Sequence, residues 1–462
     1  MKSTKYIANY RHLAGATVIF LSNFAWAGIP VQQWTQASGA RVSLVESPAI
    51  PMVDVQIDFD AGGRRDPAGQ VGLAAMTAGQ ISNGVLAVPG APARDENALS
   101  EAWADLGASF GASAGTDRMS FTLRSLTYPD LLGRAVALAA QQIGAPAFAQ
   151  AEWLRDRERV KAALKEANTR PATQAQRAFD KAVFGDHPYG RETTEASLMR
   201  IGTDDMRTLY ARLIAPCRAV VSIVGAVTRA QADAMAAQLL SRLPTGATSP
   251  AAAASTSAPT PAACAPLPTV PEVAPLAAPQ ELRLPFNSAQ AHVLIGQPGY
   301  KRDDPDYFAL TVGNYILGGG GFVSRLTAEV REKRGLSYSV YSYFAPGLHA
   351  GAFAVGLQTR PDQATQAVQV ARDVLQKFVS EGPTPAELKA AKDYFSGSFA
   401  LRIDTNQKLL GNISNMAWNH LPIDYLDTWT QQVEKVTVAD IRAAFSRKLQ
   451  PGKMVTVVVG GE

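Results

Sequence analysis

Cysteine is nearly absent from this sequence, since only Cys217 and Cys264 occur in 462 residues. So few thiols cannot supply a disulfide framework for a chain of this size. A single bridge between the two stays open, and because Cys264 lies in a segment typical of a linker, such a bridge would be incidental to the fold. The fold must rest on buried apolar cores, and 47% hydrophobic residues allow more than one domain.

Histidine is scarce as well. Beyond the N-terminal segment the chain has only His187, His292, His349 and His420, and no two of them fall within one helical turn. Two histidines one turn apart are the usual local signature of a zinc-binding helix. We therefore predict no metal ligand in this chain.

An excess of positive charge disappears once the N-terminal segment is removed. Residues 1–27 start with basic residues, continue with the apolar stretch 13–24 and end in Ala-Trp-Ala, a pattern typical of a cleavable secretory signal. The apolar stretch is shorter than the roughly 20 residues of a spanning helix. Removing three basic residues leaves 41 − 40 = +1, so the composition does not favour a nucleic-acid partner. We predict a periplasmic or otherwise exported protein, cleaved near Ala27, without an integral membrane segment afterwards.

One segment, residues 245–280, is rich in Ala, Pro, Ser and Thr and carries almost no charge. Such a composition cannot bury a core and is typical of a semi-extended linker. It divides the chain into an N-terminal half, 28–244, and a C-terminal half, 281–462.

The two halves repeat the same order of elements. Alternating apolar and polar residues predict strands over 53–63 and 291–299, and further strands over 119–125 and 352–357. Helices predicted to begin at Thr203 and Thr437 are 437 − 203 = 234 residues apart, and the strands that follow end at Gly225 and Gly460, 460 − 225 = 235 apart. This constancy indicates a duplication, with an α+β fold of two homologous α/β-sandwich halves, each a mixed or antiparallel sheet packed with helices.

Two helices are predicted after the second of these strands. Apolar residues on one face predict a helix over 362–379, and Thr384-Pro-Ala-Glu387 has the spacing of a capping box, so a new helix should begin there.

Three aspartates, Asp54, Asp58 and Asp60, alternate with apolar residues along the first of these strands. Period-two spacing places them on the face opposite the apolar side chains. We predict a solvated face rather than a calcium or paired-carboxylate site.

The most informative stretch is 316–338, in which the glycine run Gly318, Gly319, Gly320 and Gly321 is followed by Phe322, by a short helix carrying Arg331 and by a strand opening at Tyr338. Glycines let another backbone approach closely. The guanidinium and the phenol can donate hydrogen bonds to a carbonyl or a developing oxyanion. The alternatives are a flexible turn, an ordinary helix-surface arginine and a core tyrosine.

These features together resemble the insulinase and pitrilysin family of metallopeptidases (inverzincins), which includes the mitochondrial processing peptidases and two-subunit bacterial enzymes. The resemblance rests on the paired halves, on Phe184-Gly-Asp-His-Pro-Tyr-Gly190, on 290–299, and on the glycine run followed by Arg331-Glu-Lys-Arg-Gly-Leu-Ser-Tyr338. It implies that the halves form a clamshell around extended peptides. In this family His187-Pro-Tyr-Gly190 looks like a structural turn.

The zinc-binding motif of the family is missing. Members that cut peptides carry His-x-x-Glu-His on the helix after the first strand, where the histidines hold zinc and the glutamate activates its water. By register with the family, Ala75 and Gly79 stand in place of the histidines and Ala78 in place of the glutamate. Glu166 falls roughly at the third ligand but is expected to be a solvated surface residue.

The resemblance implies that Arg331 and Tyr338 hold the carbonyl of the residue being cleaved, with Gly318 to Phe322 contacting the substrate. We predict a non-metal-binding subunit, not an enzyme on its own and without a cofactor, that completes the zinc site of a homologous partner in a heterodimer. The alternative is a non-catalytic peptide-binding or assembly protein. A stand-alone serine hydrolase is disfavoured because no convincing catalytic triad can be named among the serines.

Overall fold

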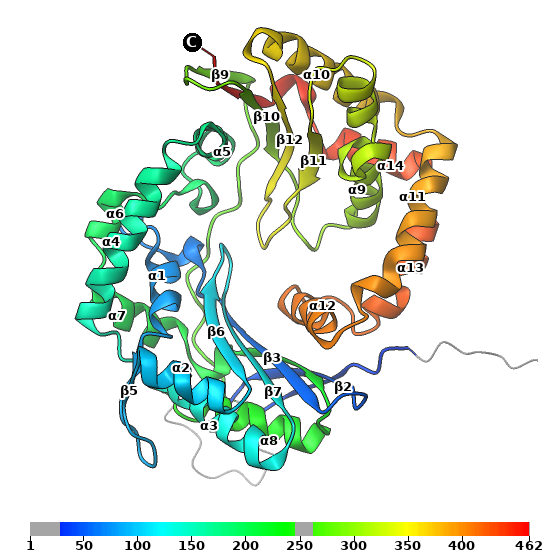
Figure 1. Ribbon diagram of the computed structural model, residues 1–462. Helices are drawn as coiled ribbons and strands as arrows, with labels where there is room; N and C mark the ends of the chain where they lie inside the picture. The colour runs from blue at the N-terminus through cyan, green and yellow to red at the C-terminus, as the bar shows by residue number, and fades with distance from the viewer. Residues whose placement is uncertain (1–27, 245–261, 462) are drawn as a thin grey trace, which may run out of the picture.

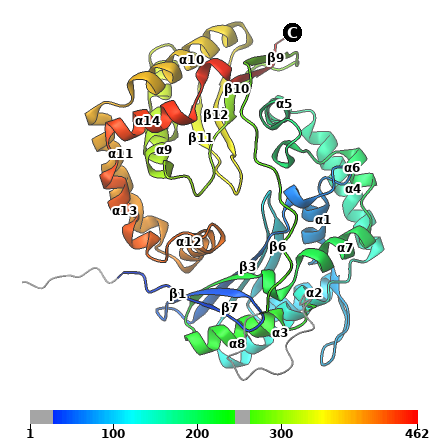
Figure 2. The ribbon, with the colours of Figure 1, turned by 180° about the vertical axis from the view of Figure 1, so that it is seen from behind.

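The computed structural model describes residues 28–244 and 262–461, which form two halves facing each other (Figure 1). The predicted signal segment 1–27 and part of the predicted linker, 245–261, lie outside the described residues. In Figure 1 the lower half, blue to green, is N-terminal and the upper half, through yellow to red, is C-terminal, and Figure 2 shows both from behind. No helix in the described ranges combines the length and apolar character that a membrane crossing requires.

The N-terminal half is built on a mixed sheet that, within the described residues, has six strands in the order β1-β2-β8-β3-β7-β6. Neighbouring strands are antiparallel except β2 and β8, which are parallel. The strands are β1 (Gln32–Thr35), β2 (Arg41–Glu46), β3 (Met52–Phe59), β6 (Ser109–Ala114), β7 (Met119–Leu126) and β8 (Val220–Gly225), with a separate pair β4 (Gly84–Val85) and β5 (Arg94–Asp95). The helices are α1 (Leu73–Gln80), α2 (Glu96–Asp105), α3 (Pro129–Gly144), α4 (Gln150–Ala167), α5 (Pro171–Phe184), α6 (Glu195–Met199), α7 (Thr203–Leu213) and α8 (Arg229–Leu240).

The C-terminal half repeats this plan around a sheet with the order β11-β12-β10-β13-β9. Here β13 and β9 are the parallel pair and the other neighbours are antiparallel. The strands are β9 (Gln280–Leu284), β10 (Ala291–Pro298), β11 (Val340–Phe344), β12 (Ala352–Thr359) and β13 (Val455–Val459). The helices are α9 (Tyr307–Asn314), α10 (Ala364–Glu381), α11 (Pro385–Ser398), α12 (Asn406–Trp418), α13 (Tyr425–Lys435) and α14 (Val438–Lys448).

The spacing of equivalent elements confirms the predicted duplicated α+β fold. Helices α3 and α10 begin 364 − 129 = 235 residues apart, α5 and α12 begin 406 − 171 = 235 apart, and β8 and β13 begin 455 − 220 = 235 apart. The predicted capping box is also present, because Thr384 accepts from the Glu387 amide at 3.2 Å and the Thr384 amide donates to the Glu387 carboxylate at 2.7 Å.

Each half lends one helix to the sheet of the other half. Helix α5 packs on β10 and β13, where it buries Phe179 and Val183, and α12 packs on β3 and β8 of the N-terminal sheet (Figures 1 and 2). Val45 and Val224 of the N-terminal sheet accordingly belong to the core of the C-terminal half. Both faces of each sheet are therefore covered.

This exchange of helices shows that the predicted solvated face of β3 was wrong. Asp54 is 4% exposed and Asp58 is fully buried, because α12 lies over that side of the strand. Their charges are compensated by arginines: Arg124 pairs with Asp54 at 2.8 Å and Arg118 with Asp58 at 3.0 Å. The third aspartate, Asp60, is partly exposed and is paired with two neighbouring arginines.

The described part of the predicted linker is fastened to the molecule. Cys217 and Cys264 form a disulfide, and the Ala262 amide donates to the carbonyl of Ala37 at 2.9 Å. Farther along, Glu272 accepts from the Ala350 amide at 2.9 Å, so the segment reaches the C-terminal half before β9 begins. The bridge is therefore a structural contact and not an incidental one. The domain boundaries drawn from the sequence stay predictions.

Candidate functional site

Helix α1 is the helix on which the resemblance would place the zinc ligands of the family. Its N-terminus is capped by the buried Asp66, which accepts from the amides of Gly72 and Ala74 at 2.8 and 2.9 Å, and burial raises the pKa of Asp66 to about 6. Ala75 and Gly79 are exposed on this helix and Ala78 is buried. These three positions present no side chain that can hold a metal or accept a proton.

The carboxylate that faces α1 is Asp156, on α4, and sequence reasoning missed it. Gln80 and Asn83 donate to one of its oxygens at 2.8 and 2.6 Å, and Arg155 and Arg159 pair with the other at 3.2 Å. Burial raises the pKa of Asp156, but these hydrogen bonds and charges outweigh it and hold the pKa below its usual value. The carboxylate is therefore saturated by donors.

Glu166 lies elsewhere on α4. Its side chain is 58% exposed and pairs with Arg170 at 2.7 Å, as expected for a surface residue. Across residues 28–244 and 262–461, no group of three or more His, Cys, Asp or Glu side chains is placed to hold a metal ion. The predicted lack of a cofactor stays a prediction.

The glycine run is packed largely against its own half. A Cβ atom on Gly318 would lie 2.5 Å from the backbone nitrogen of Ser342 on β11, and on Gly320 it would lie 2.7 Å from the carbonyl oxygen of Tyr315. Gly319 is similarly close to Asn314. Gly321 differs, because nothing lies within 4 Å of a Cβ built on it, and its φ of +60° is what favours glycine there.

Irregular helix surrounds this run. The π-helix η4 (Tyr315–Gly319) includes the first two glycines, the 3₁₀ turn η5 (Gly321–Val323) begins at the last one, and the π-helix η6 (Thr327–Glu332) follows and carries Arg331. π-helical turns are rare and are found frequently at functional sites. The predicted strand begins two residues later than expected, at Val340, so Tyr338 lies in the loop before β11.

The predicted pair is brought together at the surface. The guanidinium carbon of Arg331 lies 4.7 Å from the ring centroid of Tyr338 and 4.8 Å from that of Phe322. Tyr338 is 80% exposed and Phe322 is 69% exposed, so neither ring points into the packed interior. We call Phe322, Arg331 and Tyr338 the arginine sandwich. The contribution of Phe322 was not recognisable from sequence spacing, since it depends on how η5 and η6 fold together.

The donors of this sandwich are free for a ligand. Within the described part of the chain, neither the guanidinium of Arg331 nor the hydroxyl of Tyr338 makes a hydrogen bond or ion pair with another residue. The neighbouring cations Lys333 and Arg334 are instead held by Glu329, at 2.6 and 2.7 Å. The arrangement can donate several hydrogen bonds to one carbonyl or oxyanion.

The His187 turn is structural, as expected, and it also joins the halves. The Tyr189 amide donates to His187 Nδ1 at 3.1 Å, which closes the turn. The Tyr189 hydroxyl donates to Asp117 at 2.7 Å and accepts from the amide of His349, in the β11–β12 hairpin of the other half, at 3.1 Å. Asp117 also accepts from the Leu348 amide at 3.0 Å.

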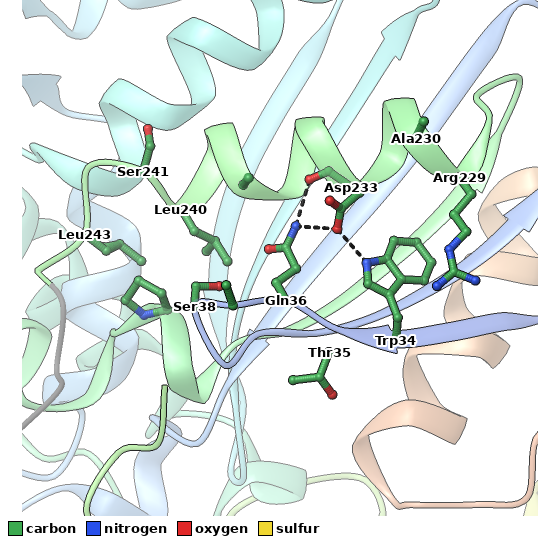
Figure 3. Close-up of a pocket in the computed structure, with 13 residues that line it drawn as sticks. Trp34, Thr35, Gln36, Ser38, Arg229, Ala230, Asp233, Leu240, Ser241 and Leu243 are labelled. Carbon is green, nitrogen blue, oxygen red and sulfur yellow. Dashed lines mark hydrogen bonds between the residues drawn. The ribbon is translucent and has the colours of Figure 1, made fainter. Parts of the chain in front are cut away.

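Two cavities lie apart from the arginine sandwich. One of about 510 Å³ lies between the halves, near Asp180 and Trp418. Another of about 790 Å³ lies between β1 and α8, where Trp34 and Gln36 both donate to Asp233, at 2.6 and 2.8 Å (Figure 3). Neither is lined by Arg331 or Tyr338.

Comparisons with known proteins agree with this picture. Residues 41–197 match the family described as "Insulinase (Peptidase family M16)", and residues 200–395 match "Peptidase M16 inactive domain". A crystal structure of a peptidase M16 inactive domain from Pseudomonas fluorescens is 32% identical, with a TM-score of 0.84 over 94% of this chain and 98% of that one. The chain therefore belongs to the insulinase family, peptidase family M16.

Two curated relatives differ in whether they are described as peptidases. A non-peptidase homolog of Helicobacter pylori is 25% identical over 87% of this chain and 88% of its own length. An uncharacterized zinc protease of Streptomyces coelicolor is 31% identical, but the match spans only 57% of this chain and 55% of that protein. With the inactive-domain matches, the first of these supports a non-catalytic member of the family.

Proposed function

We propose that this chain is the non-metal-binding subunit of an exported zinc metallopeptidase complex. It binds extended peptides and contributes Arg331 and Tyr338 to the zinc site of a homologous partner subunit, which performs the cleavage. On this proposal the C-terminal half of this chain faces the zinc-bearing half of the partner. The exposed glycines of the run, Gly319 and Gly321, then border the bound peptide.

One observation carries the proposal: two hydrogen-bond donors stand together at the surface with no acceptor of their own among the described residues. A surface arginine near an acidic residue would normally form an ion pair, as Arg334 does with Glu329. Arg331 instead lies against two aromatic rings, which leaves its N–H groups unused. An acceptor from outside the chain is the natural complement.

The chemistry divides between the two chains. Zinc in the partner would supply the activated water and polarise the carbonyl. Arg331 and Tyr338 would donate hydrogen bonds to the carbonyl oxygen as negative charge develops on it, and losing one such donor typically lowers the rate about 10² to 10³-fold. Because α1 has alanine and glycine at the ligand positions, this chain cannot supply the metal part itself.

Export is supported by the Cys217–Cys264 disulfide in addition to the N-terminal sequence pattern. Disulfides persist in oxidising compartments such as the bacterial periplasm and are rare in the cytosol. The disulfide joins the linker to the N-terminal half, so its loss in a reducing compartment would weaken that attachment.

The second candidate function is a peptide-binding or assembly protein that cuts nothing in any complex. It is favoured by the saturated Asp156 beside α1 and by the description of the Helicobacter relative as a non-peptidase homolog. A scaffold, however, has no use for paired donors without an acceptor.

The test is reconstitution. The chain is co-expressed with any M16 homologue that carries His-x-x-Glu-His and is found encoded beside it, and cleavage of a quenched fluorescent peptide is measured. We expect cleavage only with both chains, a loss of about 10² to 10³-fold with Arg331→Ala, and little change with Arg334→Ala as the matched control. Peptide binding without cleavage in every pairing would establish the scaffold instead, and stoichiometric zinc in the isolated chain would overturn the assignment of α1.

A further inference from the structure

Three separate segments build the arginine sandwich. Phe322 comes from the turn η5, Arg331 from η6 and Tyr338 from the loop before β11, and both rings lie within 5 Å of the same guanidinium carbon, at 4.8 and 4.7 Å. Distances up to about 6 Å are typical of cation–π contacts, which are electrostatic attractions between a cation and the face of a ring. Both rings therefore contact the guanidinium and restrict its motion.

Such a restraint differs from an ion pair in what it leaves free. A carboxylate would orient the guanidinium by occupying its N–H groups, whereas an aromatic face attracts the charge and leaves all five N–H groups available. A long arginine side chain samples many rotamers in water, and ordering it costs conformational entropy. If the side chain is already ordered in the free protein, this cost no longer opposes the binding of a ligand. A ring that restrains Arg331 thus prepares it for an external acceptor.

Exposure of Phe322 does not by itself point to a function, since single exposed apolar residues are common on protein surfaces. The neighbouring Val323 makes this clear, because it lies on the same turn and is 73% exposed, against 69% for Phe322. What distinguishes Phe322 is its contact with the guanidinium. Val323 is therefore a matched control for exposure and apolar character on the same turn.

We propose that Phe322 is a positioning residue for Arg331: its ring, together with that of Tyr338, holds the guanidinium ready to donate to the peptide carbonyl. This proposal rests on the proposed function of the sandwich as part of a partner's active site. It assigns Phe322 a role through Arg331 rather than a role as a wall for the substrate side chain.

The first measurement needs no partner. In the isolated chain, the Nε–Hε signal of Arg331 is assigned by its loss in Arg331→Lys, and its mobility is followed by the heteronuclear ¹⁵N–¹H NOE. We expect a rigid signal in the wild type, a mobile one in Phe322→Leu, which keeps an apolar side chain without a ring face, and a rigid one in Phe322→Tyr. Val323→Ala should leave the signal unchanged. An equally rigid signal in Phe322→Leu would overturn the proposal.

The second measurement uses the reconstituted complex. Because Phe322→Leu leaves the donor present but loosely held, we expect kcat to fall on the order of tenfold, less than for loss of Arg331 itself, with KM nearly unchanged. Phe322→Tyr should restore kcat. If every Phe322 variant raised KM with kcat unchanged, Phe322 would contact the substrate directly and the positioning role would be wrong.

Two further outcomes are separable. If Phe322→Leu and Val323→Ala both weakened association of the two chains in sedimentation, the exposed turn would be a subunit contact and the proposal would fail. If no pairing cleaved peptide, the catalytic role would fall together with the proposed function. The NOE alone would then decide whether the Phe322 ring orders Arg331.

Discussion

The buried aspartate on β3 offers the sharpest test of how the halves fit together. Asp58 is fully buried and accepts from the hydroxyl of Ser414, on α12 of the other half, at 3.2 Å. Arg118 bridges both groups, with one nitrogen 3.0 Å from Asp58 and 3.1 Å from Ser414. The two bonds to Ser414 would not exist if that face of β3 were solvated.

The magnitudes follow from burial and charge. Ser414→Ala removes a hydrogen bond to a buried carboxylate and should lower the free energy of unfolding by about 1.5–3 kcal/mol. Asp58→Ala leaves Arg118 without its partner, and breaking a buried ion pair costs about 3–5 kcal/mol. Since the Arg118 side chain is 30% exposed and partly solvated, the lower end is expected.

The assay is urea denaturation of both single variants and of the double variant, with unfolding monitored by tryptophan fluorescence. Trp418, beside Arg118, contributes to this signal. Direct contact should give a coupling energy between Asp58 and Ser414 of about 1 kcal/mol or more. Ser446→Ala is the control, because its hydroxyl donates to Val379 within the C-terminal half and should not couple to Asp58. A coupling near zero, with Asp58→Ala nearly neutral, would refute the packing of α12 on β3.

Three further outcomes are expected. Burial lowers the pKa of His187 below its ordinary 6.5, so the folded state binds fewer protons than the unfolded state; stability should fall as pH drops below 6.5, and less so in His187→Gln, by thermal unfolding across pH. Cys217→Ser should cost about 2–4 kcal/mol in urea, and no loss would contradict a structural bridge. Gly318→Ala should cost about 1–3 kcal/mol by crowding Ser342, whereas Gly411→Ala, with open space around it, should be neutral or stabilising.

The repeated spacing made the fold predictable from sequence, because a duplicated domain keeps its elements at a constant separation. Which helix covers the polar face of each sheet was not predictable from sequence. The alternation in β3 identifies the polar face at Asp58 but contains no information about α12, which begins 406 − 58 = 348 residues later. The arginines that neutralise this face gave no signal either, since cross-strand partners depend on register. Periodicity therefore defined each sheet and left the contact between halves unknown.

The candidate site was foreseen only in part. Arg331 and Tyr338 could be selected because their chemistry and spacing are legible in the sequence, whereas Phe322 joins them through the folding of η5 against η6. The glycine run suggested room for a foreign backbone, yet Gly318 admits the protein's own strand at Ser342. A glycine marks a close approach without revealing which chain approaches.

The most direct test of the division of labour between two chains is the effect of Tyr338→Phe on kcat in the reconstituted complex. Removing only the hydroxyl deletes one donor to the developing oxyanion, so we predict a loss on the order of 10² to 10³-fold with KM nearly unchanged. Tyr341→Phe, on the adjacent strand and 44% exposed, is the matched control and should leave kcat near wild type. Equal kcat values for the two variants would contradict the claim that this chain completes its partner's active site.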